Sequence, residues 1–158
     1  MFRELSRKNK KISDAECVEL LINEKRGVLS VNGENGYPYG MPMNHYYNEE
    51  DGCIYFHCAK NGYRIDSLNA CNKVSFCVVE KGEASKGDWG LIVRSVIVFG
   101  KIDIIEDTST VAYITDKLSR KFTNDEEYIK KEITSFVHMT ALLRLTPENI
   151  CGKKVKES

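Results

Sequence analysis

The chain has 158 residues, a length typical of one domain, and we expect residues 1–158 to form a single unit with a substantial buried core. Lysine and arginine number 23, as do aspartate and glutamate, so the formal net charge of zero argues against a general nucleic-acid-binding protein. Contents of 42% hydrophobic and 29% charged residues exclude a disordered chain.

The N-terminal segment 1–16 is basic but has no apolar run of the kind found in a secretory signal peptide. No window of the sequence reaches 18 apolar residues, so no transmembrane span is expected. The six cysteines form no C-x-x-C pair, and we interpret them as reduced thiols rather than as metal ligands. These features favour a cytoplasmic protein without a membrane partner or a metal.

The first half of the chain predicts one helix and three strands. Ser13 and Glu16 form a capping-box pattern that starts a short amphipathic helix ending near Arg26. The strands are predicted over residues 27–33, 37–48 and 53–59, with turns at 33–36 and 49–52. Pro38 and Pro42 lack a backbone donor, so the second strand should lie at an edge or be interrupted.

The second half continues this pattern of strands and short helices. Helices are predicted over 64–71, 108–121 and from Asn124 to about Phe136, and strands over 73–80, 91–107 and 137–145. The stretch 81–90 is interpreted as a polar loop and 150–158 as a tail. A bend is expected at Gly100. About six strands in mostly antiparallel order predict a small barrel.

The stretch YFHCAKNGYR, residues 55–64, contains the first candidate site. Side chains alternate along a strand, so Ile54 and Phe56 share an apolar face and His57 points to the other side. His57 is therefore expected to face a pocket or a subunit interface. Its unperturbed pKa suits proton transfer near neutral pH.

The loop after His57 leads into a helix and contains Lys60, Gly62 and Arg64. Free N–H groups and the helix dipole both favour an anion at such a position, and an arginine can hold a phosphate with two hydrogen bonds. Glycine and cations are also common in ordinary solvated turns. The residues alone leave an anion site and a routine turn both open.

Two further strands contain polar groups that a ligand could use. Asn44 follows Pro38 and Pro42 in the second predicted strand. This strand either leaves backbone groups free for a ligand or is an edge strand that packs its aromatic side chains on the core. Ser95 interrupts an apolar row in the strand 91–107, where it either packs or hydrogen-bonds a ligand. No Ser-His-Asp set, Cys-His set or phosphate-binding P-loop is present, so any chemistry would depend on a cofactor.

The order of four motifs resembles the FMN-binding split-barrel flavoproteins. The motifs are GVLSVNGENGYPYGMPMNHYY, IYFHCAKNGYRIDSL, VRSVIVFGKI and CGKK, which together run from about Gly27 to Lys154. The chain looks most like the nitroimidazole-resistance (Nim) branch, relatives of pyridoxamine 5′-phosphate oxidase. The resemblance implies a mainly β fold, a six-stranded antiparallel split β-barrel with short flanking α-helices.

The resemblance also implies a homodimer with FMN in the groove between the subunits. The proline-rich strand would contact the isoalloxazine ring, and the loop after His57 would hold the phosphate. His57 matches the histidine implicated in the active site of the Nim branch and is the catalytic candidate. The implied cofactor contacts are Pro42, Met43, Asn44, His57, Ala59, Lys60, Gly62, Arg64, Ser95, Val96 and Lys153.

The implied function is that of an FMN-dependent oxidoreductase that reduces a small, electron-poor compound, with nitroaromatic and nitroimidazole compounds as one class. The alternatives are a flavin store or redox sensor without turnover, or the same barrel with haem or a deazaflavin. Tyr63 stands where the family pattern has a second cation, so phosphate binding would depend on Lys60, Arg64 and loop amides. The extended C-terminal segment of pyridoxamine phosphate oxidases is missing, which argues against a vitamin-specific oxidase.

Overall fold

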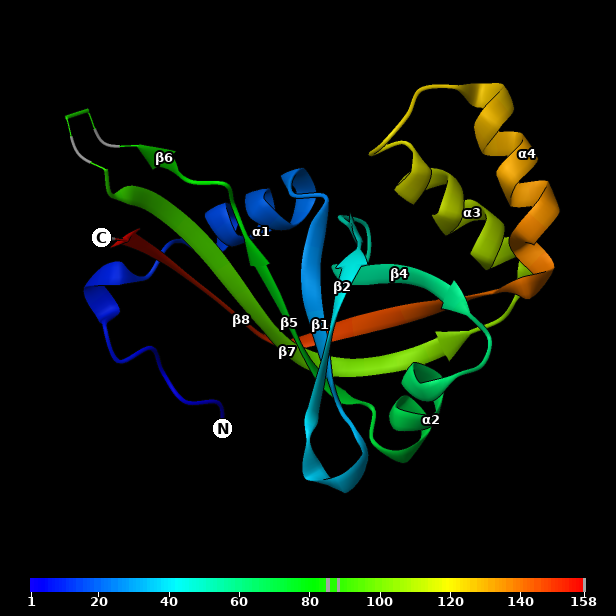
Figure 1. The fold of residues 1–158 in the computed structure, drawn as a ribbon, viewed down its shortest axis with the longest axis horizontal. Helices are drawn as coiled ribbons and strands as arrows, with labels where there is room; N and C mark the ends of the chain where they lie inside the picture. The colour runs from blue at the N-terminus through cyan, green and yellow to red at the C-terminus, as the bar shows by residue number, and fades with distance from the viewer. Residues whose placement is uncertain (85, 88, 158) are drawn as a thin grey trace.

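One antiparallel sheet, rolled into a split barrel, forms the body of the molecule (Figure 1). The computed structural model describes residues 1–84, 86–87 and 89–157. The strands are β1 (Arg26–Asn32), β2 (Pro38–Asn44), β3 (Tyr46–Asn48), β4 (Cys53–Ala59), β5 (Lys73–Val79), β6 (Glu83–Ala84), β7 (Leu91–Ile105) and β8 (Thr140–Glu157). The α-helices in the described residues are α1 (Asp14–Asn23), α2 (Tyr63–Ala70), α3 (Thr108–Ser119) and α4 (Glu126–Phe136). The predicted mainly β split barrel with flanking helices is thereby confirmed.

The two edges of the sheet come from one continuous segment of the chain. The strand order is β2-β1-β5-β7-β8-β4-β3, with β6 added beside β7. Strands β2 and β3 lie at opposite ends of this order, yet only His45 separates them in the sequence. Segment 38–48 therefore passes from one edge to the other. The proline-rich strand is interrupted and lies at an edge, as predicted, and counting β2 with β3 leaves six main strands.

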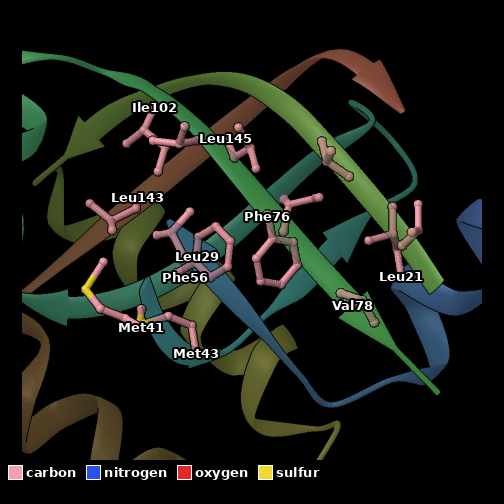
Figure 2. Packing of buried hydrophobic residues seen from close by; sticks show 14 of the residues in the cluster. Leu21, Leu29, Met41, Met43, Phe56, Phe76, Val78, Ile102, Leu143 and Leu145 are labelled. Carbon is pink, nitrogen blue, oxygen red and sulfur yellow. The ribbon is translucent and has the colours of Figure 1, made fainter. Parts of the chain in front are cut away.

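The barrel interior is filled by side chains from these strands. Phe56 of β4 and Phe76 of β5 meet edge to face with ring centroids 4.9 Å apart, and both side chains are fully buried. Figure 2 shows the two rings side by side, with Leu29 of β1 close to Phe56. Aromatic pairs of this geometry contribute both buried area and a favourable ring contact. The alternation along β4 thus predicted correctly that Ile54 and Phe56 share a face that lies in the core.

The bend predicted in β7 occurs at Gly100, where the pairing with β8 shifts register between Phe99 and Gly100. A Cβ atom at position 100 would collide with the carbonyl oxygen of Thr146. The close approach of the two backbones therefore requires glycine at this position.

The final strand differs from the prediction. Residues 137–139 form a 3₁₀ turn rather than the start of a strand, and β8 continues through the predicted tail to Glu157. The reason is pairing that is distant in sequence, because β7 pairs with β8 from Leu91↔Glu157 to Ile105↔Leu142. The predicted loop 81–90 likewise contains the short strand β6, which pairs with β7. Positions 85 and 88 of that loop lie outside the described residues.

Helix α3 covers part of the outer face of β4 and β8. Tyr55 of β4 and Leu142 of β8 are buried against Val111 and Ile114 of α3. Figure 1 shows α3 and α4 side by side as a hairpin that precedes β8. Because α3 covers Tyr55, the outer face of β4 becomes accessible only toward its end, at His57.

Helix α1 begins with the predicted capping box. The backbone N–H of Glu16 donates to Ser13 Oγ at 3.3 Å, and the N–H of Ser13 donates to Glu16 Oε2 at 2.8 Å. This reciprocal pair satisfies two donors that the first helical turn would otherwise leave free. No helix in the described residues is long and apolar enough to span a membrane.

Candidate functional site

A cavity of about 620 Å³ lies between the end of β4 and the α3–α4 hairpin. We call it the hairpin cavity. Three residues singled out from the sequence line it, namely Asn44, His57 and Ala59. The other lining residues are Cys58, Thr115, Leu118, Ser119, Phe122, Thr123, Tyr128, Glu132, Phe136, Met139 and Thr140. His57 therefore faces a pocket, as the alternation along β4 predicted.

His57 is an exposed residue that lines the hairpin cavity, and nearby protein atoms partly desolvate its imidazole. This partial desolvation, together with the positive charge of Arg64, lowers the pKa of His57 below its ordinary value. The neutral imidazole is therefore the main form at pH 7. It offers one N–H donor and one acceptor nitrogen to a molecule in the cavity.

A second cavity, of about 230 Å³, lies at the start of α2. We call it the loop cavity. Its lining residues are Tyr39, Ala59, Asn61, Gly62, Tyr63, Arg64 and Ile65. Ala59 also lines the hairpin cavity, so the two cavities adjoin.

Helix α2 presents an uncapped N-terminus to the loop cavity. Gly62 is the N-cap residue, with φ of 108°, and no side chain among the described residues caps the helix. This left-handed backbone conformation favours glycine, and a Cβ atom there would meet nothing within 4 Å. The first backbone N–H groups of the helix are therefore available to an anion.

Arg64 reaches from α2 across to the strands. Its Nε donates to the sulfur of Met41 on β2 at 3.0 Å. The guanidinium also lies close enough to β4 to lower the pKa of His57 and to oppose the burial that raises the pKa of Cys58. One half-buried cation thus lines the loop cavity and acts on the His57 side of β4.

Tyr63 connects the loop to the β1–β2 turn. Its hydroxyl accepts a hydrogen bond from the backbone N–H of Glu34 at 2.6 Å, and its ring packs edge-on against Tyr39 at 4.9 Å. The residue that replaces an expected cation therefore anchors the loop. This contact could not be read from the sequence, because Glu34 and Tyr63 are far apart along the chain.

The remaining predicted residues occupy other positions. Ser95 and Lys153 pair across β7 and β8 and line a separate cavity of about 370 Å³ beneath the N-terminal segment. Met43 and Val96 point into the core, with exposed fractions of 7% and 0%, so only their backbone could contact a ligand. Lys60 is half-buried in the loop but lines neither the hairpin cavity nor the loop cavity.

Pro42 and Asn44 complete the placement of the predicted residues on β2. Pro42 is exposed at the sheet edge. The Asn44 side-chain oxygen accepts a hydrogen bond from Arg26 Nε at 2.9 Å, which orients the amide at the hairpin cavity. The structure thus groups Asn44, His57 and Ala59 at one cavity and Ala59, Gly62 and Arg64 at its neighbour.

The helical wall of the hairpin cavity was not identified from the sequence. The sequence spacing predicts an apolar helix face made of Tyr128, Ile129, Ile133 and Phe136, yet of these only Ile129 is fully buried. The α4 sequence has more large apolar side chains than one buried face can hold. This surplus of aromatic residues is the signal that could have indicated a pocket beside α4.

Comparison with known proteins identifies the fold family. A family model for pyridoxamine 5′-phosphate oxidase matches residues 13–154. No curated protein matches the sequence.

Solved structures share this fold at low sequence identity. A Bacteroides thetaiotaomicron protein proposed to act in 5-nitroimidazole antibiotic resistance has a TM-score of 0.78 and 19% identity, over 93% of this chain and 87% of that chain. A conserved hypothetical protein of Mycobacterium tuberculosis has a TM-score of 0.80 and 16% identity, over 95% and 90% of the two chains. An FAD-binding protein from Mesorhizobium loti has a TM-score of 0.65 and 22% identity, over 92% and 97%. At these identities the likeness concerns the fold alone.

Proposed function

Because this chain belongs to the pyridoxamine 5′-phosphate oxidase family, we propose that it is a cytoplasmic flavin-dependent oxidoreductase that binds FMN and reduces a small, planar, electron-poor compound. The observation that carries this proposal is the adjacency of the loop cavity, which suits a phosphate, and the hairpin cavity, which holds His57. Nitroaromatic compounds are one candidate class. The role proposed for the Bacteroides relative in 5-nitroimidazole resistance supports them.

The loop cavity fits the phosphate of FMN in size and in chemistry. About 230 Å³ accommodates a phosphate group with part of its ribityl chain, and the uncapped α2 N-terminus offers N–H donors. Arg64 adds a positive charge at the same place, where its remaining N–H groups can donate to phosphate oxygens.

The flavin ring would extend from the loop cavity toward β2. There Pro42 would contact the ring at the sheet edge, and Asn44 would offer its side-chain amide. When bound, the flavin would supply the electron transfer. His57 would hydrogen-bond the compound being reduced and hold or deliver a proton at its imidazole nitrogen. Asn44, oriented by Arg26, would fix the position of a polar group beside His57.

The outer face of the sheet supports the proposal of a homodimer. Val28, Val79, Ile97 and Phe99 project from three neighbouring strands with exposed fractions of 42%, 55%, 38% and 41%. Strand pairing continues one of these rows as Pro42–Val28–Cys77–Ile97–Cys151. The N-terminal segment covers only part of this face, where Phe2 stacks on Phe99 at 5.7 Å. An apolar face of this kind is typical of a subunit interface.

Sedimentation of the purified protein tests the proposed homodimer, and a mass of one chain would contradict it.

The visible spectrum of the purified protein and its response to reductant test the proposed function. We expect a flavin spectrum, bleaching by NAD(P)H or another small reductant, and reoxidation by selected acceptors. Mass analysis of the released cofactor separates FMN from FAD, which the Mesorhizobium relative binds. Tight flavin binding without turnover over a broad acceptor panel would instead support a flavin store. A haem or deazaflavin spectrum would contradict the choice of FMN.

Replacing Arg64 with alanine is expected to weaken FMN binding by about 1.5–2 kcal/mol, the lower part of the range for hydrogen bonds to charged groups, because the side chain is half-exposed. Quenching of flavin fluorescence during a titration measures the affinity. Lys73→Ala, which removes an exposed cation from the start of β5, is the matched control and should leave the affinity unchanged. Equal affinities of Arg64→Ala and the unaltered protein would remove Arg64 from the phosphate site.

A further inference from the structure

We propose that the hairpin cavity is the binding site of the electron acceptor, and that it selects planar aromatic or heteroaromatic molecules with a cationic or hydrogen-bond-donating edge. This inference rests on the proposed function, in which the flavin phosphate occupies the neighbouring loop cavity. It adds the place and the chemical class of the second ligand.

The walls of the hairpin cavity are more apolar than an ordinary surface. Phe122, Tyr128, Phe136 and Met139 line it with exposed fractions of 38%, 54%, 48% and 60%. These side chains come from the loop after α3, from α4 and from the turn after it, yet they converge on one cavity. A volume of about 620 Å³ lies within the usual range of small-molecule sites. Aromatic walls of this kind suit a flat ring.

The charge of the cavity distinguishes it from a phosphate site. Among its lining residues, Glu132 alone carries a formal charge at neutral pH, since the lowered pKa of His57 keeps that imidazole neutral. Three cations near the cavity have protein partners. Lys121 Nζ donates to the backbone carbonyls of Glu24 and His45 at 2.7 and 3.0 Å, and Arg26 Nε donates to Asn44 Oδ1 at 2.9 Å. Lys25 Nζ lies 5.5 Å from the centroid of the Phe122 ring. A lone carboxylate repels an anion and attracts a cation or a donor N–H group.

A buried hydroxyl group in the cavity also lacks a protein partner. Thr115 Oγ1, on α3, is buried and makes no hydrogen bond to any residue that the structure describes. Buried hydroxyl groups usually have a partner, so this one is available to a ligand. Thr115 on α3, Glu132 on α4 and His57 on β4 thus place three polar groups, each from a different element, around the cavity.

The position of the cavity beside the loop cavity suits an electron acceptor. Ala59 lines both, and Asn44 lies at the hairpin cavity next to the β2 residues proposed to contact the flavin ring. A ring held between the α4 aromatics and β4 would therefore have His57 as a neighbour. The phosphate-binding cation, Arg64, lines only the other cavity of the pair.

Three small probes of nearly equal size test the inference on the apo protein: benzamidine, benzamide and benzoate, which are cationic, neutral and anionic. We expect binding in that order of affinity, with amide chemical shifts in NMR spectra changing in β4, α3 and α4. In Glu132→Gln, benzamidine should bind about fivefold more weakly, the scale of a partly exposed ion pair, while benzamide binding stays unchanged. Glu127→Gln on the same helix, outside the cavity lining, is the matched control and should bind benzamidine normally.

A titration of benzamidine at saturating FMN separates the two proposals. We expect both ligands to bind together, and competition between them would overturn the inference by assigning the hairpin cavity to the flavin. Equal affinity for the three probes, or shifts confined to another surface, would also overturn it. The probe series on the unaltered chain still decides the matter if Glu132→Gln does not fold. Absence of FMN binding would instead refute the proposed function, which the probe titrations do not measure.

Discussion

Replacement of His57 by alanine is expected to lower the rate of acceptor reduction by about 100-fold or more, the scale of general acid–base catalysis. FMN affinity should change by less than about threefold, because loop amides and Arg64, rather than His57, would hold the phosphate. The reason for this difference is position, since His57 lines the hairpin cavity and not the loop cavity. Stopped-flow reoxidation of reduced flavin gives the rate, and fluorescence titration gives the affinity.

The control for this prediction is His138→Ala. His138 is exposed in the 3₁₀ turn after α4 and lies outside the cavity lining, so its removal should leave the rate unchanged. Loss of flavin from His57→Ala, with normal activity per bound flavin, would reassign His57 to cofactor binding. NMR titration gives a readout without cofactor, because Arg64→Ala should raise the pKa of His57 by removing the neighbouring cation.

Acidification from pH 7 to pH 4 is expected to cost roughly 3 kcal/mol of folding stability through His45 alone. This imidazole is fully buried, with Nε2 at 2.8 Å from the Leu21 carbonyl oxygen and no partner for Nδ1 in the described residues. Burial, reinforced by the charge of Lys121, lowers the pKa of His45 from 6.5 to about 4. Between these two values the unfolded chain binds a proton that the folded chain does not, so stability falls as the pH falls.

Urea denaturation at several pH values measures this loss. His45→Gln, which keeps an N–H donor for the Leu21 carbonyl group, should flatten the profile between pH 6.5 and about 4. The lowered pKa of His57 acts in the same direction and should leave a smaller residual slope. His138→Gln is the matched control and should retain the full slope. An unaltered protein equally stable at both ends of this window would contradict a buried neutral His45.

Much of the fold could be predicted because its signals are local. The capping box at Ser13 and the alternation of Ile54, Phe56 and His57 in β4 depend on neighbours within a few residues. The extent of β8 could not be predicted in this way, since what extends it to Glu157 is pairing with β7, whose first residue, Leu91, is far away in sequence. The interruption at His45 was indicated by the prolines of the second strand, but its exact place depends on barrel closure.

The residues of the candidate site also differ in whether a local sequence signal could predict them. Positions of His57, Gly62 and Arg64 follow from the strand-to-helix turn that contains them, and the structure places them beside cavities. Glu132 was missed because α4 meets β4 only through the tertiary fold, and a single glutamate on an amphipathic helix is indistinguishable from a solvated one. The resemblance implied that Met43 and Val96 lie near the cofactor, but it did not say which way their side chains point. Both side chains point into the core.

Segment 38–48, which supplies both edges of the sheet, also bears on aggregation. An unpaired strand edge is a template for another chain, and a sheet ordinarily has two such edges in unrelated parts of the sequence. Here β2 and β3 belong to one segment, and the missing backbone donors of Pro38 and Pro42 limit further pairing at the β2 edge. Both edges at which an intermolecular sheet could start therefore lie in one short stretch of the chain.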